Sequence, residues 1–321
     1  MHVLVGYSST LNLEKVISEL EEDYPDVEFE HCPTRDQLID YIPDADVYFG
    51  WLHQEEFRVA DSLEWIQSPS TGVDYFLKIP ELRQSDVILT SASGTHGPCL
   101  AEHALAMLLA FTRGIKDFVL CQREHVWASQ ELRPGLVELT GSTLGIVGFG
   151  TVGRTLAKRV QGFDMRVLAV DKFPDGRPDT VDRLDPVDRL DDLLRESDYV
   201  VVTVPRTEET LGMFGPEQIA LLKPWSILIG ISRGGIIDED ALAHALCQER
   251  IAAAALDVFE DEPLPEESPL WDIDNLLITP HAAGGSQFEG AYVREIFVEN
   301  FKRFIEEDFP LRNEVDKEEG F

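Results

Sequence analysis

The chain has 321 residues, enough for two domains of ordinary size, and its hydrophobic fraction of 44% is typical of a folded globular protein. Its 60 acidic residues outnumber 27 lysines and arginines, and the formal net charge of -33 disfavours nucleic acids and anionic membranes as partners. No apolar run reaches membrane-spanning length and no basic, apolar leader opens the chain, so we expect a cytoplasmic protein.

The acidic excess extends over the whole chain instead of collecting in one tail, and only 8 of the 27 cationic residues are lysine. A merely acidic soluble protein is the alternative, but this distribution favours a halophilic protein. At molar salt the Debye length falls to about 3 Å, so the mutual repulsion of surface acids is screened. We interpret acidic pairs such as Glu21-Glu22 and Glu266-Glu267 as solvated surface, and we expect no metal site.

Residues 1 to 96 alternate between strand-like and helix-like patterns. Apolar residues at strand spacing occur in HVLVGY (2–7), VEFEHC (27–32), DVYFGW (46–51), LEWIQS (63–68) and DVILTS (86–91). Helical spacing occurs in LEKVISELEEDY (13–24) and in TRDQLIDYI (34–42), which begins with a threonine expected to cap the helix. This alternation predicts an α/β domain with a parallel sheet covered on both faces.

The remainder of the chain opens with a long apolar stretch, residues 97–120, which predicts one helix begun by Gly97-Pro98. Further strands are predicted at LGIV (144–147), MRVLAV (165–170), DYVVVTVP (198–205), WSILIGIS (225–232), AAAALDVF (252–259) and NLLITPH (275–281). A helix is predicted over 238–250 and an amphipathic one over 285–307, and we expect the last dozen residues to fray. The pattern indicates a second doubly wound sheet.

Gly148, Gly150 and Gly153 follow the first of these strands and open a helix near Val152. This spacing is typical of a dinucleotide-binding unit, in which the first glycine permits a tight turn and the second lets a pyrophosphate approach the backbone. The third glycine allows the helix to pack closely on the strand. Thr151 and Val152 then offer N–H groups to the phosphates. An ordinary tight turn is the alternative, but the flanking strand and helix favour a cofactor site.

Asp171 ends the next strand at roughly the 20-residue spacing expected for a ribose ligand. A carboxylate there accepts hydrogen bonds from a ribose 2′-OH and repels a 2′-phosphate, which favours NAD. Lys172, Arg154 and Arg206 nevertheless bring positive charge to the same region, and high salt weakens the repulsion. We therefore expect that both NAD and NADP are used.

Several further segments carry recognisable patterns: STGVDYF (70–76), GPCLAEHALAMLLAFTR (97–113), ISRGGIIDEDAL (231–242), LDVFEDEP (256–263) and TPHAAGGS (279–286). Together with the glycine fingerprint they resemble the D-isomer-specific 2-hydroxyacid dehydrogenases over nearly the whole chain. The resemblance implies an α/β fold of two doubly wound parallel-sheet domains, with a Rossmann cofactor domain inserted in a flavodoxin-like substrate domain. Residues 97–285 would bind the dinucleotide, and residues 1–96 and 286–321 would form the substrate domain. A homodimer through the helix after Pro98 is also implied.

The resemblance assigns three catalytic residues: Arg233 matches the family's arginine, Glu262 its acid and His281 its proton donor. Hydride transfer to a 2-keto acid builds negative charge on the carbonyl oxygen, and a guanidinium can hold that oxygen together with the carboxylate. A protonated imidazole delivers the proton, and a neighbouring carboxylate favours this protonated form. The alternatives are a strand-end cation for Arg233, a surface acid for Glu262 and a capped turn residue for His281.

The resemblance also implies binding residues around this centre. The substrate would bind to the Thr71 and Gly72 amides and to Arg233, with Leu52 and His53 at the mouth of the site. Further cofactor contacts are implied for Val204, Pro205, Ile231, Ser232, Asp257 and Gly284.

Two positions depart from the family pattern. Gly230 stands where many members have asparagine three residues before the catalytic arginine, so a side-chain support is missing or replaced. Ser70 stands where a glycine is common, which alters the shape of the substrate loop. Both departures leave the identity of the substrate open. For His96 and His103, near the expected hinge, packing is favoured over lining a cleft.

Three functions remain open at this point. The favoured one is hydride transfer between a nicotinamide cofactor and a small 2-keto or 2-hydroxy acid. Relatives that oxidise formate or phosphite are the enzymatic alternative. A nucleotide-sensing binding protein of the same fold is disfavoured because the chain has no Pro- or Ser-rich appendage with which to recruit a partner.

Overall fold

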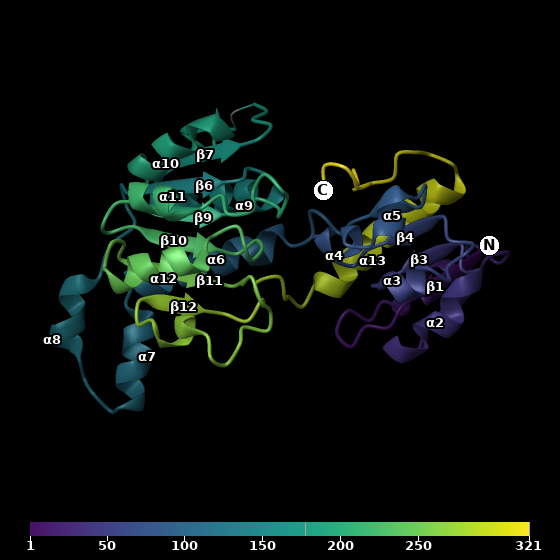
Figure 1. Cartoon of the computed structure of the whole chain (residues 1–321), viewed down its shortest axis with the longest axis horizontal. Helices are drawn as coiled ribbons and strands as arrows, with labels where there is room; N and C mark the ends of the chain where they lie inside the picture. Colours follow the sequence, from purple (N-terminus) through teal and green to yellow (C-terminus); the bar gives the residue numbers. More distant parts are fainter. Residues whose placement is uncertain (177, 321) are drawn as a thin grey trace. The chain divides into compact units, whose positions relative to one another are not determined.

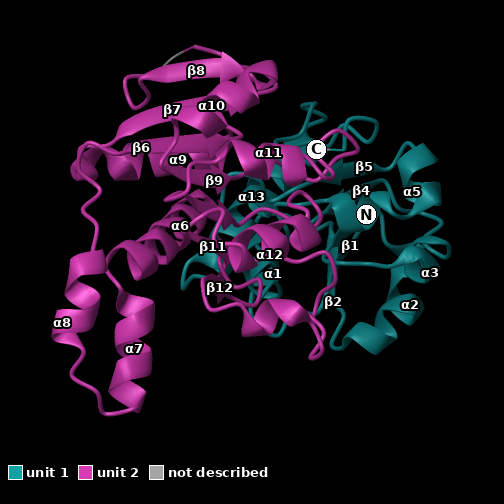
Figure 2. Ribbon diagram, turned by 60° about the vertical axis from the view of Figure 1, so that its left-hand side comes forward, with its two compact units in different colours: residues 1–96, 286–321 teal, residues 97–285 magenta. Residues whose placement is uncertain are grey.

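The computed structural model describes residues 1–176 and 178–320, and the chain divides into two compact units (Figure 2). Unit 1 consists of Met1–His96 with Ser286–Phe321, and unit 2 consists of Gly97–Gly285. Each unit contains one sheet in which all the strand pairs are parallel. The predicted fold class, two parallel-sheet α/β domains, is therefore confirmed.

Unit 1 has a five-stranded sheet in the order β2-β1-β3-β4-β5. All its strands were predicted from the apolar patterns: β1 (His2–Val5), β2 (Glu28–His31), β3 (Val47–Phe49), β4 (Trp65–Gln67) and β5 (Ile88–Thr90). Its helices are α1 (Lys15–Leu20), α2 (Leu38–Tyr41), α3 (Gln54–Phe57), α4 (Asp74–Leu77), α5 (Pro80–Gln84) and α13 (Glu289–Ile305), with 3₁₀ turns η1 (Arg35–Gln37) and η2 (Ile42–Asp44). Thr34 occupies the predicted N-cap position, before η1, but its hydroxyl donates to the Gln37 side chain (2.9 Å) and caps no backbone N–H.

Helix α13 explains why the last part of the chain belongs to unit 1 (Figure 1). Phe297 on this helix stacks on Phe49 of β3, with ring centroids 4.4 Å apart and planes 7° apart. The same ring stacks on Trp65 of β4 at 5.3 Å. All three side chains are fully buried, so the helix covers one face of the sheet with large aromatic groups.

The expectation that the C-terminal tail frays is wrong for its described part. Leu311 and Val315 are buried, and the Val315 N–H donates to the Leu89 carbonyl (2.8 Å). The Lys317 ammonium donates to two carbonyls in the segment before β5. Because β5 is an edge strand, the tail covers backbone groups that would otherwise be open to another chain.

Unit 2 has a seven-stranded sheet in the order β12-β11-β10-β9-β6-β7-β8. The strands are β6 (Thr143–Val147), β7 (Arg166–Asp171), β8 (Arg183–Pro186), β9 (Tyr199–Val202), β10 (Ile227–Gly230), β11 (Ala253–Leu256) and β12 (Leu276–Ile278). Its helices are α6 (Gly97–Thr112), α7 (Ile115–Arg123), α8 (Ser129–Leu132), α9 (Thr151–Arg159), α10 (Leu190–Glu196), α11 (Pro216–Leu221) and α12 (Glu239–Cys247), with 3₁₀ turns η3 (Arg133–Gly135), η4 (Val160–Phe163), η5 (Val187–Arg189) and η6 (Pro269–Asp272). Strand β8 was not predicted, because this edge strand is largely polar and has no apolar run.

The single helix predicted over 97–120 is two helices. Gly114 separates α6 from α7 and adopts a left-handed conformation with φ of 63°, which breaks the helix. Helix α6 packs against α9, whereas α7 and α8 extend away from the sheet of unit 2 (Figures 1 and 2).

The strand order of unit 2 reverses at β6, which pairs with β7 on one side and with β9 on the other. In open parallel sheets the carboxyl end of the strand at such a reversal is the usual place for a ligand. The glycine-spaced segment follows β6 directly. Among the described residues, none of the helices is both long and apolar enough to cross a lipid bilayer.

Candidate active site

The glycines after β6 each occupy a different steric environment. Gly148 has a positive φ of 97°, and a Cβ atom there would lie 2.8 Å from the Val204 nitrogen. A Cβ on Gly153 would lie 2.3 Å from the Gly148 carbonyl oxygen, so α9 packs directly on the turn. No atom lies within 4 Å of a Cβ built on Gly150, so this position faces open space. The turn is therefore closed at its first and third glycines and accessible at its second.

This turn ends in the first residues of α9, whose N–H groups are available to an anion. The first α-helical hydrogen bond runs from the Arg154 N–H to the Gly150 carbonyl (2.9 Å). The N–H groups of Thr151, Val152 and Gly153 precede it and have no partner within the helix. Open space at Gly150 and these free donors fit the pyrophosphate of a dinucleotide.

The segment after β9 holds the glycine turn in place. The Thr203 hydroxyl donates to the Gly148 carbonyl (2.7 Å), and Val204 packs against the same glycine. The Pro205 carbonyl accepts a hydrogen bond from the Thr210 hydroxyl (2.6 Å), which fixes the loop that follows. Val204 thus borders the glycine turn, and Pro205 lies in the loop that follows it.

Asp171, at the end of β7, already accepts hydrogen bonds from the backbone. One carboxylate oxygen accepts from the Phe149 N–H (2.6 Å) and the other from the Phe173 N–H (2.9 Å). The neighbouring Lys172 forms an ion pair with Glu209 (2.8 Å). Asp171 is therefore fixed beside the glycine turn, and the nearest lysine is partly neutralised.

The predicted catalytic acid and histidine lie side by side. The distance between His281 Nδ1 and Glu262 Oε2 is 2.6 Å, and the second oxygen of Glu262 accepts from the Phe259 N–H (2.9 Å). The carboxylate is thus anchored to its own loop while it holds the imidazole. The His281 side chain remains 45% exposed, so the ring is accessible from one side.

Arg233 lies on a turn that touches the same loop. A Cβ on Gly234 would lie 1.7 Å from the Phe259 carbonyl oxygen, so the two backbones are in direct contact at this point. The Arg233 guanidinium donates to the Ser232 carbonyl (2.8 Å), and Ile231 before it is buried. The turn that bears Arg233 is therefore in contact with the loop that carries Glu262, whose carboxylate contacts His281.

Asp257 is almost fully buried and organises the histidine loop. Its carboxylate accepts from the Thr279 hydroxyl (2.5 Å) and from the N–H groups of Ala282 (2.9 Å) and Ala283 (3.0 Å). The Asp257 carbonyl also accepts from the His281 N–H (2.8 Å). A cofactor contact was expected here, and the observed contacts are those of a residue that positions His281.

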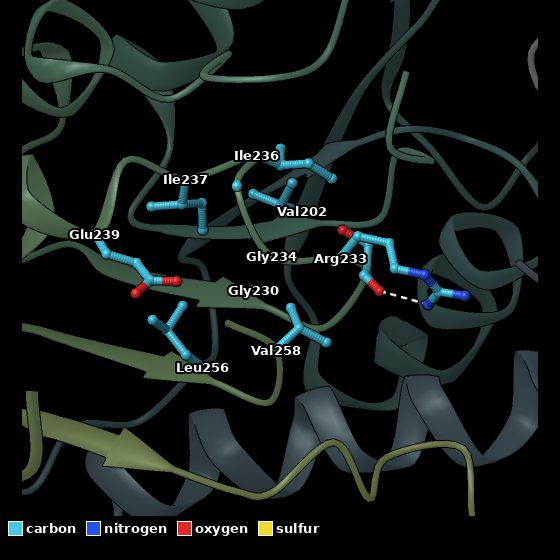
Figure 3. Close-up of a pocket in the computed structure, with 11 residues that line it drawn as sticks. Val202, Gly230, Arg233, Gly234, Ile236, Ile237, Glu239, Leu256 and Val258 are labelled. Atoms are coloured by element: carbon cyan, nitrogen blue, oxygen red, sulfur yellow. Dashed lines mark hydrogen bonds between the residues drawn. The ribbon is translucent and has the colours of Figure 1, made fainter. Parts of the chain in front are cut away.

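The position of Gly230 is filled by apolar side chains. A Cβ there would lie 2.9 Å from side-chain carbons of Ile237 and Leu256, so no polar group replaces the family's asparagine amide. In Figure 3 Arg233 and Glu239 lie at opposite ends of the small pocket beside this glycine. Burial raises the pKa of Glu239, although the Glu260 N–H donates to its carboxylate (2.6 Å).

The remaining predicted substrate residues belong to unit 1. The N–H groups of Thr71 and Gly72 donate no hydrogen bond to any other described residue. His53 contacts the Tyr75 hydroxyl through Nδ1 and lines an open pocket of about 460 Å³ together with Tyr75 and Lys78. The Leu52 side chain is fully buried in the core, which removes it from the mouth of a site.

Sequence reasoning missed a polar contact behind the histidine loop. His103 Nε2 lies 3.0 Å from the Thr279 hydroxyl and 3.7 Å from the Asp257 carboxylate. A signal was available, because Asp257 and Thr279 each follow one of two neighbouring parallel strands, β11 and β12. Gly284, on the same loop, accepts a hydrogen bond from the Cys99 thiol (3.2 Å).

This arrangement suits proton transfer beside a bound anion. Unit 2 combines an accessible imidazole fixed by a carboxylate, a guanidinium and a helix start with free N–H groups. Among the described residues, no three His, Cys, Asp or Glu side chains lie together as metal ligands would.

Known proteins resemble this chain over most of its length. A family model described as D-isomer specific 2-hydroxyacid dehydrogenase, NAD binding domain, matches residues 105–283. The glyoxylate reductase of Korarchaeum cryptofilum is 33% identical over 306 residues, which cover 92% of this chain and 91% of that protein. The D-3-phosphoglycerate dehydrogenase of Archaeoglobus fulgidus is also 33% identical, over 94% of this chain, but this covers only 57% of that longer protein.

A solved structure shares the whole fold. The NADPH-dependent glyoxylate/hydroxypyruvate reductase of Sinorhizobium meliloti, in complex with NADP and sulfate, superposes with a TM-score of 0.85 and is 25% identical. The match covers 100% of this chain and 99% of that one.

Proposed function

We propose, since this chain belongs to the D-isomer-specific 2-hydroxyacid dehydrogenase family, that it reduces a small 2-keto acid to the D-2-hydroxy acid. As a member of the family it is an oxidoreductase that depends on NAD or NADP. The observation that carries the proposal is the 2.6 Å contact between His281 and Glu262, beside the turn that bears Arg233. The His103 imidazole also lies near an anchored carboxylate, but at 3.7 Å from Asp257 and with its side chain only 25% exposed.

The residues divide the reaction between them. When bound, the dinucleotide supplies a hydride in reduction and accepts one in oxidation. Arg233 binds the substrate carboxylate and stabilises the negative charge that develops on the carbonyl oxygen. His281 gives this oxygen a proton, and Glu262 favours the protonated ring and fixes its orientation. In oxidation the neutral imidazole removes the hydroxyl proton.

Unit 1 would contribute two N–H donors to the same substrate carboxylate that Arg233 binds. The free N–H groups of Thr71 and Gly72 match the oxygens of a carboxylate. His53 lines a separate open pocket of the same unit with Tyr75 and Lys78. Unit 1 therefore has the role of a substrate domain in this proposal, and unit 2 that of the cofactor domain.

Cofactor binding would use the turn from Gly148 to Gly153 and the first N–H groups of α9. The residues Ile231, Ser232, Val204, Pro205 and Gly284 would border the nicotinamide half. Asp171 would bind the adenosine ribose and favour NAD, while Lys172 makes NADP tolerable. We therefore propose dual use of the two cofactors.

The same proposal includes a homodimer that works in the cytoplasm of a salt-adapted cell. Its interface would include the segment after α6, where Ile115, Leu120 and Val126 are about half exposed and Trp127 is 93% exposed. Apolar side chains on helices that extend from the sheet are typical of an oligomer contact. The net charge of -33 supports the adaptation to salt.

A turnover screen in molar KCl tests the proposal. Reduced cofactor is offered with glyoxylate, hydroxypyruvate, pyruvate and longer 2-keto acids, and oxidised cofactor with formate and phosphite. Reduction of at least one keto acid, lost in His281→Ala, is expected. Turnover of formate or phosphite alone would establish the alternative activity, and binding of cofactor without any turnover would indicate a nucleotide-sensing protein.

A further inference from the structure

His96 lies at the centre of a polar cluster in unit 1 that the proposed reaction has not used. The residue is only 9% exposed and is the last one before the chain enters unit 2. Its Nδ1 atom lies 2.6 Å from the Thr71 hydroxyl and 2.7 Å from the Thr95 hydroxyl. Its Nε2 atom lies 3.3 Å from the carboxylate of Glu289, the first residue of α13.

The partners of the ring determine which nitrogen carries hydrogen. A carboxylate only accepts hydrogen bonds, so Nε2 donates to Glu289. In the neutral ring Nδ1 is then an acceptor. The Ala92 carbonyl accepts from the Thr95 hydroxyl at 2.8 Å but lies 3.4 Å from the Thr71 hydroxyl. The Thr71 hydroxyl, 2.6 Å from Nδ1, is therefore the better placed donor to the ring. Glu289 thus fixes the tautomer of His96, and His96 fixes the side chain of Thr71.

The substrate loop, residues 70–73, is fixed at the Ser70 carbonyl and at the Thr71 side chain. The Ser70 carbonyl accepts from the Ala92 N–H (2.9 Å), which fixes the backbone just before Thr71. The hydroxyl of Thr71 is held by the buried imidazole. The N–H groups of Thr71 and Gly72 are the part of this loop left unbonded within the described chain.

We propose that His96 is a positioning residue for the substrate: by holding the Thr71 side chain it keeps the Thr71 and Gly72 N–H groups in place to bind the carboxylate. The inference rests on the proposed function, in which these amides bind the acid. A donor pair that is fixed before the substrate arrives loses less conformational freedom on binding. His96 therefore acts on the KM for the keto acid and leaves cofactor binding unchanged.

Three substitutions of His96 separate the contacts of Nδ1 from that of Nε2. His96→Asn places an amide near the position of Nδ1 and keeps the contact with Thr71, whereas His96→Gln reaches the position of Nε2 and keeps the contact with Glu289 but not that with Thr71. His96→Ala removes the contacts of both ring nitrogens. We expect Ala and Gln to raise the KM by about 3- to 10-fold, as for the loss of one hydrogen bond, and Asn to restore it to within about twofold. The exposed His244→Gln is the control for an unrelated histidine and should change nothing.

A second measurement reports the loop directly. Amide hydrogen exchange is measured at Ser70 and Ala92, whose N–H groups donate to the Ser68 hydroxyl and to the Ser70 carbonyl. Exchange at these two amides should accelerate in the Ala and Gln variants and remain slow in the Asn variant, in the full chain and without substrate. Equal KM values for all three variants, better rescue by Gln than by Asn, or unchanged exchange would each overturn the inference. If the exchange rates respond as expected but the wild type reduces no keto acid, the role of His96 in fixing the loop is supported and the proposed function is wrong.

Discussion

The carboxylate of Glu262 differs from an ordinary surface acid because both of its oxygens are engaged. One accepts from the Phe259 N–H and the other contacts His281 at 2.6 Å. Glu262→Gln keeps the shape and an oxygen for the Phe259 N–H but removes the charge that attracts an imidazolium. Reduction needs a proton from this ring, so kcat/KM for the keto acid should fall by roughly 10-fold in Glu262→Gln. The amide still holds the ring, so the cofactor dissociation constant should not change.

The measurement is kcat/KM in both directions for wild type and Glu262→Gln. His281→Ala is the matched control, with a loss of about 10²- to 10⁴-fold in rate and a normal cofactor dissociation constant. An unchanged kcat/KM in Glu262→Gln would mean that this carboxylate supports the loop and not the proton transfer.

Lys172, which follows Asp171 in the sequence, forms an exposed ion pair with Glu209 in which Nζ lies 2.8 Å from Oε2. A 2′-phosphate would compete with Glu209 for this lysine. Glu209→Gln should therefore raise the affinity for NADPH by about 2- to 5-fold with little change for NADH, within the range of exposed charge pairs. Lys172→Ala should lower NADPH affinity by a similar factor. The dissociation constants of NADH and NADPH, measured by cofactor fluorescence for wild type and both variants, test this prediction. If the wild type binds no NADPH, the proposal that both cofactors are used is wrong.

For single residues, the sequence could predict which functional side chains follow the strands and some of their neighbours, but not the packing of side chains around them. His281 and Glu262 each follow a recognisable strand, so their proximity could be anticipated from the parallel sheet. The apolar environment of Gly230 and the burial of Leu52 could not be anticipated, because both depend on side chains that lie far apart in sequence.

At the scale of elements, Asp198 joins three segments of unit 2 just before β9. Its carboxylate accepts from Lys223 (2.8 Å), from the Trp225 indole (2.8 Å) and from the Thr143 N–H at the start of β6 (2.8 Å). Burial alone would raise the pKa of this carboxyl. The three hydrogen bonds outweigh burial and hold the pKa of Asp198 below the usual value of an aspartate.

A carboxyl whose pKa is lowered by folding stabilises the protein at any pH above its unfolded pKa, and this stability is lost as the pH falls through the folded value. Asp198→Asn should therefore lower the free energy of unfolding by about 1.5–3 kcal/mol at neutral pH, as for hydrogen bonds to a charged group. The difference from wild type should shrink below about pH 4. Urea unfolding at several pH values measures it, and a deficit that does not vary with pH would contradict the assignment to the charge.

The elements that the sequence failed to predict have local causes. Gly114 ends α6 only because its φ is 63°, and a glycine inside an apolar helical pattern does not by itself announce this conformation. The tail after α13 is acidic enough to suggest fraying, yet Leu311 and Val315 find buried positions beside β5. The packing of the tail depends on which strand lies at the edge of the sheet. The order of strands in a sheet cannot be deduced from any single segment of the sequence.

At the scale of the whole molecule, the late position of the glycine fingerprint follows from the insertion of one unit in the other. The chain leaves unit 1 after His96 and returns at Ser286. His96 is the last residue before the chain leaves unit 1, and Glu289 follows shortly after the return at Ser286. The contacts of His96 with Glu289 and Thr71 therefore link the substrate loop to the two segments where the chain leaves and re-enters unit 1. Family resemblance could predict the insertion but not this cluster, in which Thr71 and Glu289 lie 25 and 193 residues from His96 in sequence.

The net charge of -33 belongs to the whole chain and leads to a prediction about salt. Exposed acids repel one another across tens of ångströms in dilute buffer, and screening shortens that range to about 3 Å near 1 M salt. The midpoint of thermal unfolding should therefore rise steeply between about 0.1 M and 2 M KCl, and keto-acid reduction should follow it. Sucrose at matched osmolality is the control, because it strengthens apolar burial without screening charge. Equal stabilisation by sucrose, or full stability in dilute buffer, would mean that the acidic surface is not an adaptation to salt.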